Sequence, residues 1–278
     1  MTTTSSSLPS EVDDSGRTSS ARAAISARTL RTDRWWVSPL VTAIVLGVFI
    51  GYTTVRLFMR KDYWVGAYHY LTPLYSPCLS ASCVPGSSHF GSPLPTFPLA
   101  LPLPIIIFPI LAGFRASCYY YRKAGYRAFL LSPPGCAVAE PARKYTGETR
   151  LPLALQNLHR YFFYLASVLL LINTYDAVAA FFPADGGFGV GLGSLILLIN
   201  VTMLWLYSLS CHACRHIAGG RLKHFSKHPV RYWFWTRVST LNGRHMQFAW
   251  ASLITVMLTD VYIMAVAAGW ITDFRLFN

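Results

Sequence analysis

The sequence predicts an all-α integral membrane protein, a bundle of five transmembrane helices preceded by a disordered tail. Of its 278 residues, 53% are hydrophobic and only 13% are charged, about half the usual share of a soluble domain. The net charge is +13, and the basic residues lie between long apolar runs. So few charges cannot cover a soluble protein of this length, which argues against a soluble enzyme. The spacing of the basic residues indicates membrane topology and not nucleic-acid binding.

Residues 1–32 are expected to form a disordered cytoplasmic tail, and residues 33–278 the transmembrane domain. The tail is rich in Ser, Thr, Arg and Ala and has no apolar pattern that would bury a face. The first apolar run begins only near Val37, which argues against a cleaved signal peptide. Arg34, Trp35 and Trp36 precede that run and are typical of an anchor at the membrane surface.

Five apolar stretches are long enough to cross about 30 Å of hydrocarbon as helices. In chain order they cover roughly Val37–Phe58, Leu99–Cys118, Tyr161–Phe181, Leu192–Ser210 and Phe248–Trp270. The second stretch contains Pro102, Pro104 and Pro109. A membrane helix tolerates proline where neighbouring groups satisfy the freed carbonyls, so this stretch is still expected to span.

The basic residues predict the orientation of the helices. Residues 115–160 hold eight basic residues against Glu140 and Glu148, and residues 215–244 hold seven basic residues and no acid. Because short basic loops stay in the cytoplasm, both segments and the amino terminus are expected inside. Five spans then place the carboxyl terminus outside.

Residues 60–98 form the expected outer loop, which is rich in Pro, Ser, Tyr and Gly. A loop of this length is unusual in a compact domain and suggests a role of its own. It contains Cys78 and Cys83. Outside the cytoplasm these two thiols are expected to form a disulfide.

A cluster of thiols and imidazoles lies in the segment Ser210-Cys211-His212-Ala213-Cys214-Arg215-His216, at the expected cytoplasmic end of the fourth span. On a helix, Cys211 and Cys214 share one face, and His212 and His216 share another. Gly219 and Gly220 are expected to end this helix. Thiolates combined with imidazoles suit zinc or an iron–sulfur cluster.

Other potential ligands are expected at the same membrane depth, because they begin or end neighbouring spans. Any one of them alone is more often a buried thiol or a helix cap than a ligand. Their convergence favours a metal or cluster site instead. The candidate ligands are Cys118, Cys211, Cys214, His159, His212, His216 and His245.

Three kinds of centre fit such a set to different degrees. A structural zinc site closes with four ligands but has no obvious purpose inside a helical bundle. A b-type haem needs two His facing each other from different helices, which the set allows at the inner side only. A Rieske-type [2Fe–2S] cluster uses two Cys and two His, although the chain lacks the two loops of soluble Rieske domains. From the residues alone, haem and iron–sulfur remain alternatives.

Several local sequences resemble the membrane-anchor subunit of succinate dehydrogenase, respiratory complex II, in its actinobacterial, mycobacterial-type, single-chain form. The resemblance spans about Arg31 to the end of the chain. The segments that carry it are Ser117–Lys123, Ser132–Pro141, Gln156–Phe162, Cys211–His216 and Lys223–Pro229.

The resemblance implies an anchor in the bacterial plasma membrane for two soluble partners, a flavoprotein with FAD and an iron–sulfur subunit with further clusters. The chain would hold no succinate site and would pass electrons to a quinone, with menaquinone expected. It implies an embedded Rieske-type [2Fe–2S] centre instead of the two haems of other five-helix anchors. Its ligands would be Cys118 with Cys211 or Cys214, and two of the four His. A higher oligomer of the complex is also possible on this resemblance.

Reduction of a quinone consumes two protons, so ionisable residues inside spans are functional candidates. Asp176 and Asp260 lie toward the outer ends of the third and fifth spans, and His69 and Tyr70 lie in the outer loop. They are expected to serve a quinone pocket or a proton path, or else to be helix-end residues at the membrane surface.

A haem b anchor is the alternative within the redox class. From another class, the alternative is a small transporter or a structural membrane protein without a cofactor. The few charges near the middle of the spans and the lack of an evident inverted repeat argue against transport.

Overall fold

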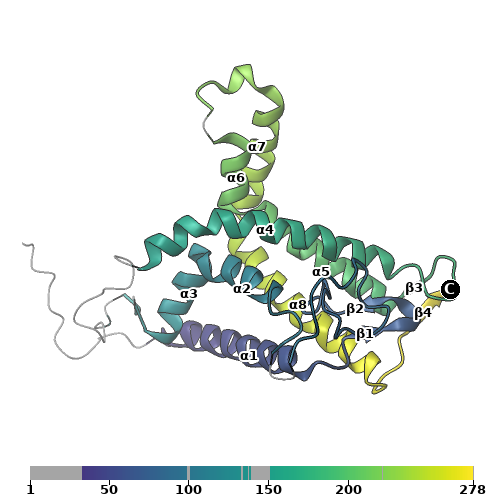
Figure 1. Ribbon diagram of the computed structural model, residues 1–278. Helices are drawn as coiled ribbons and strands as arrows, with labels where there is room; N and C mark the ends of the chain where they lie inside the picture. Colours follow the sequence, from purple (N-terminus) through teal and green to yellow (C-terminus); the bar gives the residue numbers. More distant parts are fainter. Residues whose placement is uncertain are drawn as a thin grey trace, which may run out of the picture.

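The computed structural model of the protein describes residues 33–98, 101–132, 134–136, 138, 151–220 and 222–277, and side chains of the helix beginning at Leu151 from residue 157 onward. The tail expected to be disordered, residues 1–32, lies outside this part of the chain. The described residues form a predominantly helical bundle whose long helices run nearly side by side (Figure 1).

Four helices in the described part of the chain are long and apolar enough to cross a membrane. Their apolar residues are continuous over 18 residues or more, which is what burial in lipid requires. The expected first, third, fourth and fifth spans agree with these helices to within a few residues, apart from an earlier start of the third. They are α1 (Val37–Met59), α4 (Leu151–Ala179, apolar from Asn157), α5 (Leu192–Leu209) and α8 (His245–Ala267).

The expected span at residues 99–118 is wrong in length. Among the residues described in this stretch, only α2 (Ile107–Ser117) is helical, and its 11 residues cover roughly 16 Å, about half of the hydrocarbon thickness. Pro102 and Pro104 lie before α2. They would not fit in the helix interior, because a proline has no N–H group to donate and its ring clashes with the preceding turn. Pro109 falls in the first turn, where N–H groups have no helical partner anyway. A count of five full spans is therefore not confirmed.

The short helix α2 packs closely against α4. A Cβ atom on Gly113 would lie 2.4 Å from the ring of Phe162, so any larger residue would force that ring to move. A new helix, α3 (Tyr119–Phe129), begins after a break at Cys118 and packs against α1. The close α2–α4 contact thus brings Cys118 next to the beginning of the apolar part of α4.

One end of the bundle, called the sheet end, carries the small amount of β-structure. There β1 (Trp64–Val65) and β2 (Tyr70–Leu71) pair across the 3₁₀ turn Gly66–Tyr68, and β3 (Val190–Gly191) pairs with β4 (Arg275–Phe277). The expected disulfide between Cys78 and Cys83 is present in the same loop region. The carboxyl terminus lies at this end (Figure 1).

The opposite end, called the cysteine end, carries a helical hairpin that projects sideways from the bundle (Figure 1). It consists of α6 (His212–Gly219), the 3₁₀ turn Phe225–Lys227 and α7 (Pro229–Asn242). As expected, α6 ends at Gly219, where a Cβ atom would lie 2.2 Å from Trp235 of α7.

The expectation that Cys211 lies on a helix, on the same face as Cys214, is wrong. The fourth span ends at Leu209, and Cys211 caps the beginning of α6 with an extended backbone. Cys211 and Cys214 therefore do not share a face inside one helix. The break turns the chain at the cysteine end, and it places Cys211 in the bundle while α6 leaves it.

Candidate metal centre

Two Ser-Cys pairs occupy equivalent breaks between helices. Ser117-Cys118 joins α2 to α3, and Ser210-Cys211 joins α5 to α6. Both cysteines have an extended backbone, with φ and ψ of −66° and 129° in Cys118 and −68° and 145° in Cys211. Each thiol thus lies at the amino terminus of a helix, where the helix dipole and free N–H groups favour a thiolate.

His159 of α4 connects one residue of each pair. Its Nδ1 atom lies 2.8 Å from the hydroxyl of Ser117, and its Nε2 atom lies 3.1 Å from the sulfur of Cys211. Because Nδ1 has a hydroxyl partner, the ring is held with Nε2 directed at the thiol. The imidazole is thus oriented in the way that metal-binding His residues are in proteins.

His245 of α8 repeats the arrangement with the partners exchanged. Its Nδ1 atom lies 2.8 Å from the hydroxyl of Ser210, and its Nε2 atom lies 3.6 Å from the sulfur of Cys118. Cys118, Cys211 and His245 are all at least 98% buried. Four helices therefore bring together two thiols and two oriented imidazoles in a crosswise arrangement.

These four residues line a cavity of about 500 Å³ at the cysteine end. His212 and His216 also line it, whereas Cys214 does not and packs against the apolar core beside it. Six of the seven candidate ligands thus come together. The full lining is Ser117, Cys118, Tyr119, Tyr120, Asn157, His159, Arg160, Cys211, His212, Ala213, His216 and His245.

The electrostatics of the cavity favour neutral thiols when no metal is bound. Burial raises the pKa of Cys118, against smaller opposing effects of backbone N–H groups. Burial raises the pKa of Cys211 to about 12, and the neighbouring thiols Cys118 and Cys214 add to this. Burial also lowers the pKa of His212, which favours a neutral imidazole. Since metals bind thiolates, loading this cavity would release protons.

Within the described residues, no group of three or more His, Cys, Asp and Glu side chains is placed to hold a single metal ion. The contacts are instead pairwise, His159 with Cys211 and His245 with Cys118. A closed four-ligand zinc site, considered from the sequence, has no counterpart in this part of the chain.

The predicted quinone or proton residues of the sheet end have separate hydrogen-bond partners, although the ring of His69 lies 6.3 Å from that of His89, which contacts Asp176. Asp260 forms a fully buried ion pair with Arg56, whose Nε lies 2.6 Å from the carboxylate, and it also accepts a hydrogen bond from Tyr52. Asp176 accepts hydrogen bonds from Ser76 and, at 2.7 Å, from Nδ1 of His89.

The two loop candidates have separate partners. Tyr70 is fully buried and donates to Asp273 at 2.8 Å, and Nδ1 of His69 lies 2.8 Å from the carbonyl oxygen of Phe182. None of the four predicted residues lines the cavity at the cysteine end or the larger cavity described next. Their contacts tie loops to helices at the sheet end.

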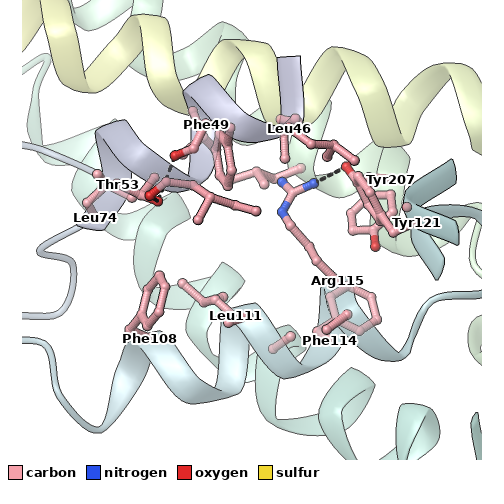
Figure 2. A pocket seen from close by; sticks show the side chains of 18 of the residues that line it. Leu46, Phe49, Thr53, Leu74, Phe108, Leu111, Phe114, Arg115, Tyr121 and Tyr207 are labelled. Carbon is pink, nitrogen blue, oxygen red and sulfur yellow. Dashed lines mark hydrogen bonds between the residues drawn. The ribbon is translucent and has the colours of Figure 1, made fainter. Parts of the chain in front are cut away.

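A second, larger cavity of about 700 Å³ lies between α1, α2 and α3 and the core of the bundle. Figure 2 shows the side chain of Arg115 reaching from α2 into the space beside α1, where its guanidinium meets Tyr121. The aromatic rings of Phe114 and Tyr207 also line this cavity (Figure 2). From the sequence, Arg115 contributed only to the charge of a loop, and Ser117 and Ser210 had no role. The repeated Ser-Cys dipeptide was the signal that could have identified the two serines.

Comparison with known proteins identifies the family. Residues 37–269 match the model of the actinobacterial succinate dehydrogenase subunit SdhC. The chain belongs to this family. A solved structure that resembles it is the Mycobacterium smegmatis Sdh1 complex in the apo form, with 60% sequence identity, a TM-score of 0.86, and coverage of 94% of this chain and 98% of that chain. Among curated proteins, none matches this sequence.

Membership in the SdhC family makes the chain a membrane subunit of succinate dehydrogenase, as its resemblance implied. Its partners are the flavoprotein and iron–sulfur subunits of that oxidoreductase. The apolar helices of the bundle agree with this membrane location.

Proposed function

We propose that this SdhC subunit receives electrons from the iron–sulfur partner and passes them to menaquinone through a Rieske-type [2Fe–2S] centre at the cysteine end. Cys118 and Cys211 would hold one iron, and His159 and His245 the other. The observation that carries the proposal is the crosswise arrangement of two thiols and two imidazoles, each imidazole fixed by a serine hydroxyl. A Rieske-type cluster takes two Cys and two His ligands, and the crosswise arrangement brings a set of this composition together.

An unsatisfied polar atom supports the fit. The hydroxyl of Tyr207 is buried, and it has no hydrogen-bond partner among the described residues. It lies close enough to the sulfur of Cys118 to stabilise a thiolate there, which lowers the pKa of that thiol, but no hydrogen bond of normal geometry joins the two groups. Since a buried unpaired hydroxyl costs about 1–3 kcal/mol, a bound group that accepts its proton would offset this cost. The sulfur atoms of a cluster are acceptors of this kind.

A haem b centre fits the same residues less well. Haem ligation needs two imidazole nitrogens that face each other across the porphyrin. Here each Nε2 atom faces a cysteine sulfur, at 3.1 Å in His159 and 3.6 Å in His245, and both Nδ1 atoms are occupied by serine hydroxyls.

The residues of this chain would bind and tune the centre. Ser117 and Ser210 hold the imidazole rings in position, and the amino termini of α3 and α6 stabilise negative charge on Cys118 and Cys211. When bound, a [2Fe–2S] group supplies one-electron transfer, which suits a subunit between one-electron clusters and a two-electron acceptor.

The same proposal fixes the orientation, with the cysteine end in the cytoplasm and the carboxyl terminus outside. The disulfide Cys78–Cys83 lies at the sheet end, and disulfides persist outside the cytoplasm. Basic residues of α3 and of the projecting hairpin lie at the cysteine end, as the positive-inside rule requires. These are Arg122, Lys123, Arg127, Lys223, Lys227, Arg231, Arg237 and Arg244. This basic end would receive the soluble partners.

The test is a reduced-minus-oxidised visible spectrum, with electron paramagnetic resonance, of the purified complex. We expect broad bleaching and a rhombic iron–sulfur signal in the membrane subunit. The Cys211→Ser complex should lose this signal, whereas the matched Cys214→Ser complex should keep it, because Cys214 does not line the cavity. Sharp haem bands, or loss of the signal with Cys214→Ser alone, would overturn the proposal.

A further inference from the structure

The helical hairpin at the cysteine end connects two membrane spans directly. Its first helix, α6, follows the end of α5 at Leu209, and its second helix, α7, leads into α8 at His245. The base of the hairpin therefore lies at the depth where both spans leave the hydrocarbon. From there the hairpin points away from the bundle, across the direction of the long helices (Figure 1). A hairpin with this base and this direction lies along the membrane surface.

Two arginines hold the helices of the hairpin together. Arg231 of α7 donates from Nε to the carbonyl oxygen of Ala218 in α6 at 3.0 Å. Arg215 of α6 donates to the hydroxyl of Ser239 at 3.0 Å, and its guanidinium lies 5.0 Å from the centre of the ring of Trp235. Because α6 and α7 are joined along their length, the outward face of α7 keeps a fixed direction.

That outward face of α7 is apolar. Val230, Trp233 and Phe234 follow the i, i+3, i+4 spacing of one helix face, and each side chain is more than half exposed. The opposite face of α7 already packs within the hairpin, where the ring of Trp235 lies against Gly219 of α6. The exposed face is therefore a second apolar surface of the same helix. Contiguous exposed apolar side chains mark a surface that contacts protein or lipid.

The hairpin is also strongly basic. Residues 186–259 contain no Asp or Glu, whereas the turn between α6 and α7 carries Lys223 and Lys227, both exposed. Arg237 is exposed one turn beyond Trp233, and its guanidinium lies 5.4 Å from the centre of that ring. In the described part of the chain, no carboxylate lies within 4.0 Å of these three cations. Their charge is thus available to an anion from outside the chain.

Charge and direction together favour lipid over protein on this face. A second copy of the chain would bring the same positive charge to the contact, and like charges oppose pairing. A soluble partner approaches the cysteine end along the long helices, whereas the hairpin points sideways (Figure 1). Anionic headgroups offer phosphate to the basic side chains and an acyl boundary to the aromatic ones. Helices and loops of this composition lie in the membrane interface.

We propose that the hairpin of α6 and α7 lies in the headgroup layer and binds the phosphates of anionic phospholipids. Lys223 and Lys227 at its turn and Arg237 on α7 bind the phosphates, and Trp233 and Phe234 enter the boundary of the acyl chains. This inference goes beyond the proposed electron transfer and does not depend on it, because none of these five residues is a proposed ligand of the metal centre.

A spin label on α7 tests the contact with the membrane. Val230 is 69% exposed, so a nitroxide on Val230→Cys should leave the fold intact, and Cys136→Ser removes an exposed native thiol. Asp185→Cys, exposed in the loop after α4, is the control in water. In nanodiscs that contain phosphatidylglycerol, we expect the label at residue 230 to collide more often with oxygen than with a nickel chelate, and the control label to show the opposite order. Collisions mainly with the chelate, or with neither reagent because a protein covers the label, would overturn the proposal.

The preference for anionic lipid has its own test. Lys223→Gln combined with Lys227→Gln removes two charges from the hairpin, and Lys123→Gln combined with Arg127→Gln removes two exposed charges from α3 as the matched control. Native mass spectrometry of the delipidated complex measures binding of phosphatidylglycerol and of phosphatidylcholine with the same acyl chains. Each basic side chain contributes about fivefold to binding at an anionic surface, so the Kd for phosphatidylglycerol should rise about 25-fold in the hairpin variant.

The control variant should bind phosphatidylglycerol with a Kd close to that of the wild type, and the wild type should bind phosphatidylcholine much more weakly. Equal weakening in the two variants, or equal binding of the two lipids by the wild type, would overturn the anionic site. Neither experiment uses the iron–sulfur signal, so failure of the proposed function would leave both results unchanged.

Discussion

The two ends of the bundle handle buried polar groups in opposite ways. At the sheet end, Asp260, Asp176 and Asp273 are each matched by an arginine, a histidine or a tyrosine within hydrogen-bond distance. At the cysteine end, thiols and imidazoles face one another, and the nearby Tyr207 hydroxyl has no partner among the described residues. Groups that satisfy one another stabilise the fold. Groups left with spare bonding capacity are where a further component binds.

This comparison bears on the expectation that Asp176 and Asp260 serve a quinone pocket or a proton path, which stays a prediction. The buried aspartates appeared to be functional because charges within spans are costly. Their partners remove most of that cost, and several partners come from distant parts of the chain, such as Arg56 for Asp260. Sequence shows the cost of a buried charge, whereas only the structure shows whether it is paired.

The largest expected effect is at the ion pair of the sheet end. Asp260→Leu leaves Arg56 buried without its partner, which should cost about 3–5 kcal/mol of stability. We expect a markedly lower midpoint of thermal unfolding in detergent. The double variant Arg56→Leu with Asp260→Leu should recover most of the loss. An Asp260→Leu variant as stable as the wild type would mean that the ion pair between Arg56 and Asp260 does not stabilise the fold.

Next in size is the effect of the serines at the cysteine end. Replacing both Ser117 and Ser210 by alanine removes the hydroxyls that orient His159 and His245. Iron affinity should fall about 10–100-fold, because such outer hydrogen bonds hold ligands in position. Iron per complex after dialysis against a chelator measures this. Ser167→Ala, which removes only a hydroxyl bound to a carbonyl of its own helix, is the control. Equal iron loss in both proteins would contradict the proposed role.

A smaller effect is expected for His89 at the sheet end. His89→Gln replaces the ring that contacts Asp176 at 2.7 Å. Because Ser76 remains as a partner, stability should fall by only about 1 kcal/mol. Quinone reduction should not change. A large fall in the kcat of quinone reduction with unchanged thermal stability would instead support a role of Asp176 in a proton path.

Tyr207→Phe is the change expected to cost no stability. The hydroxyl is buried and has no partner in the described part of the chain, so its removal from cluster-free protein should relieve part of the cost of an unpaired hydroxyl, about 1–3 kcal/mol. In the loaded complex, the same change should lower the reduction potential of the centre, because a hydrogen bond to its sulfur atoms is lost. Redox titration followed by electron paramagnetic resonance measures this. An unchanged potential would show that the hydroxyl does not reach the centre.

The membrane class, four long helices and the Cys78–Cys83 disulfide followed from the sequence because each depends on local composition or a short spacing. The second predicted span is not confirmed at full length. Pro102 and Pro104 lie before the helix, and α2 covers only about half of the hydrocarbon thickness. The sequence named seven candidate ligands, since thiols and imidazoles at span ends are visible in it. It could not show which of them face one another.

That selection depends on two breaks and one close contact. Breaks at Cys118 and Cys211 direct their sulfur atoms into the bundle, and Gly113 lets α2 approach α4 closely enough for Ser117 to reach His159.

By itself, the sequence determined that this chain is a basic, multi-helix membrane protein with thiols and imidazoles at one depth, because hydropathy and charge are properties of the residues. Only the tertiary structure decided which of them face one another, which carboxylates are already paired and where a cavity remains. These are distances between segments that lie as many as 208 residues apart in the sequence, and packing sets them.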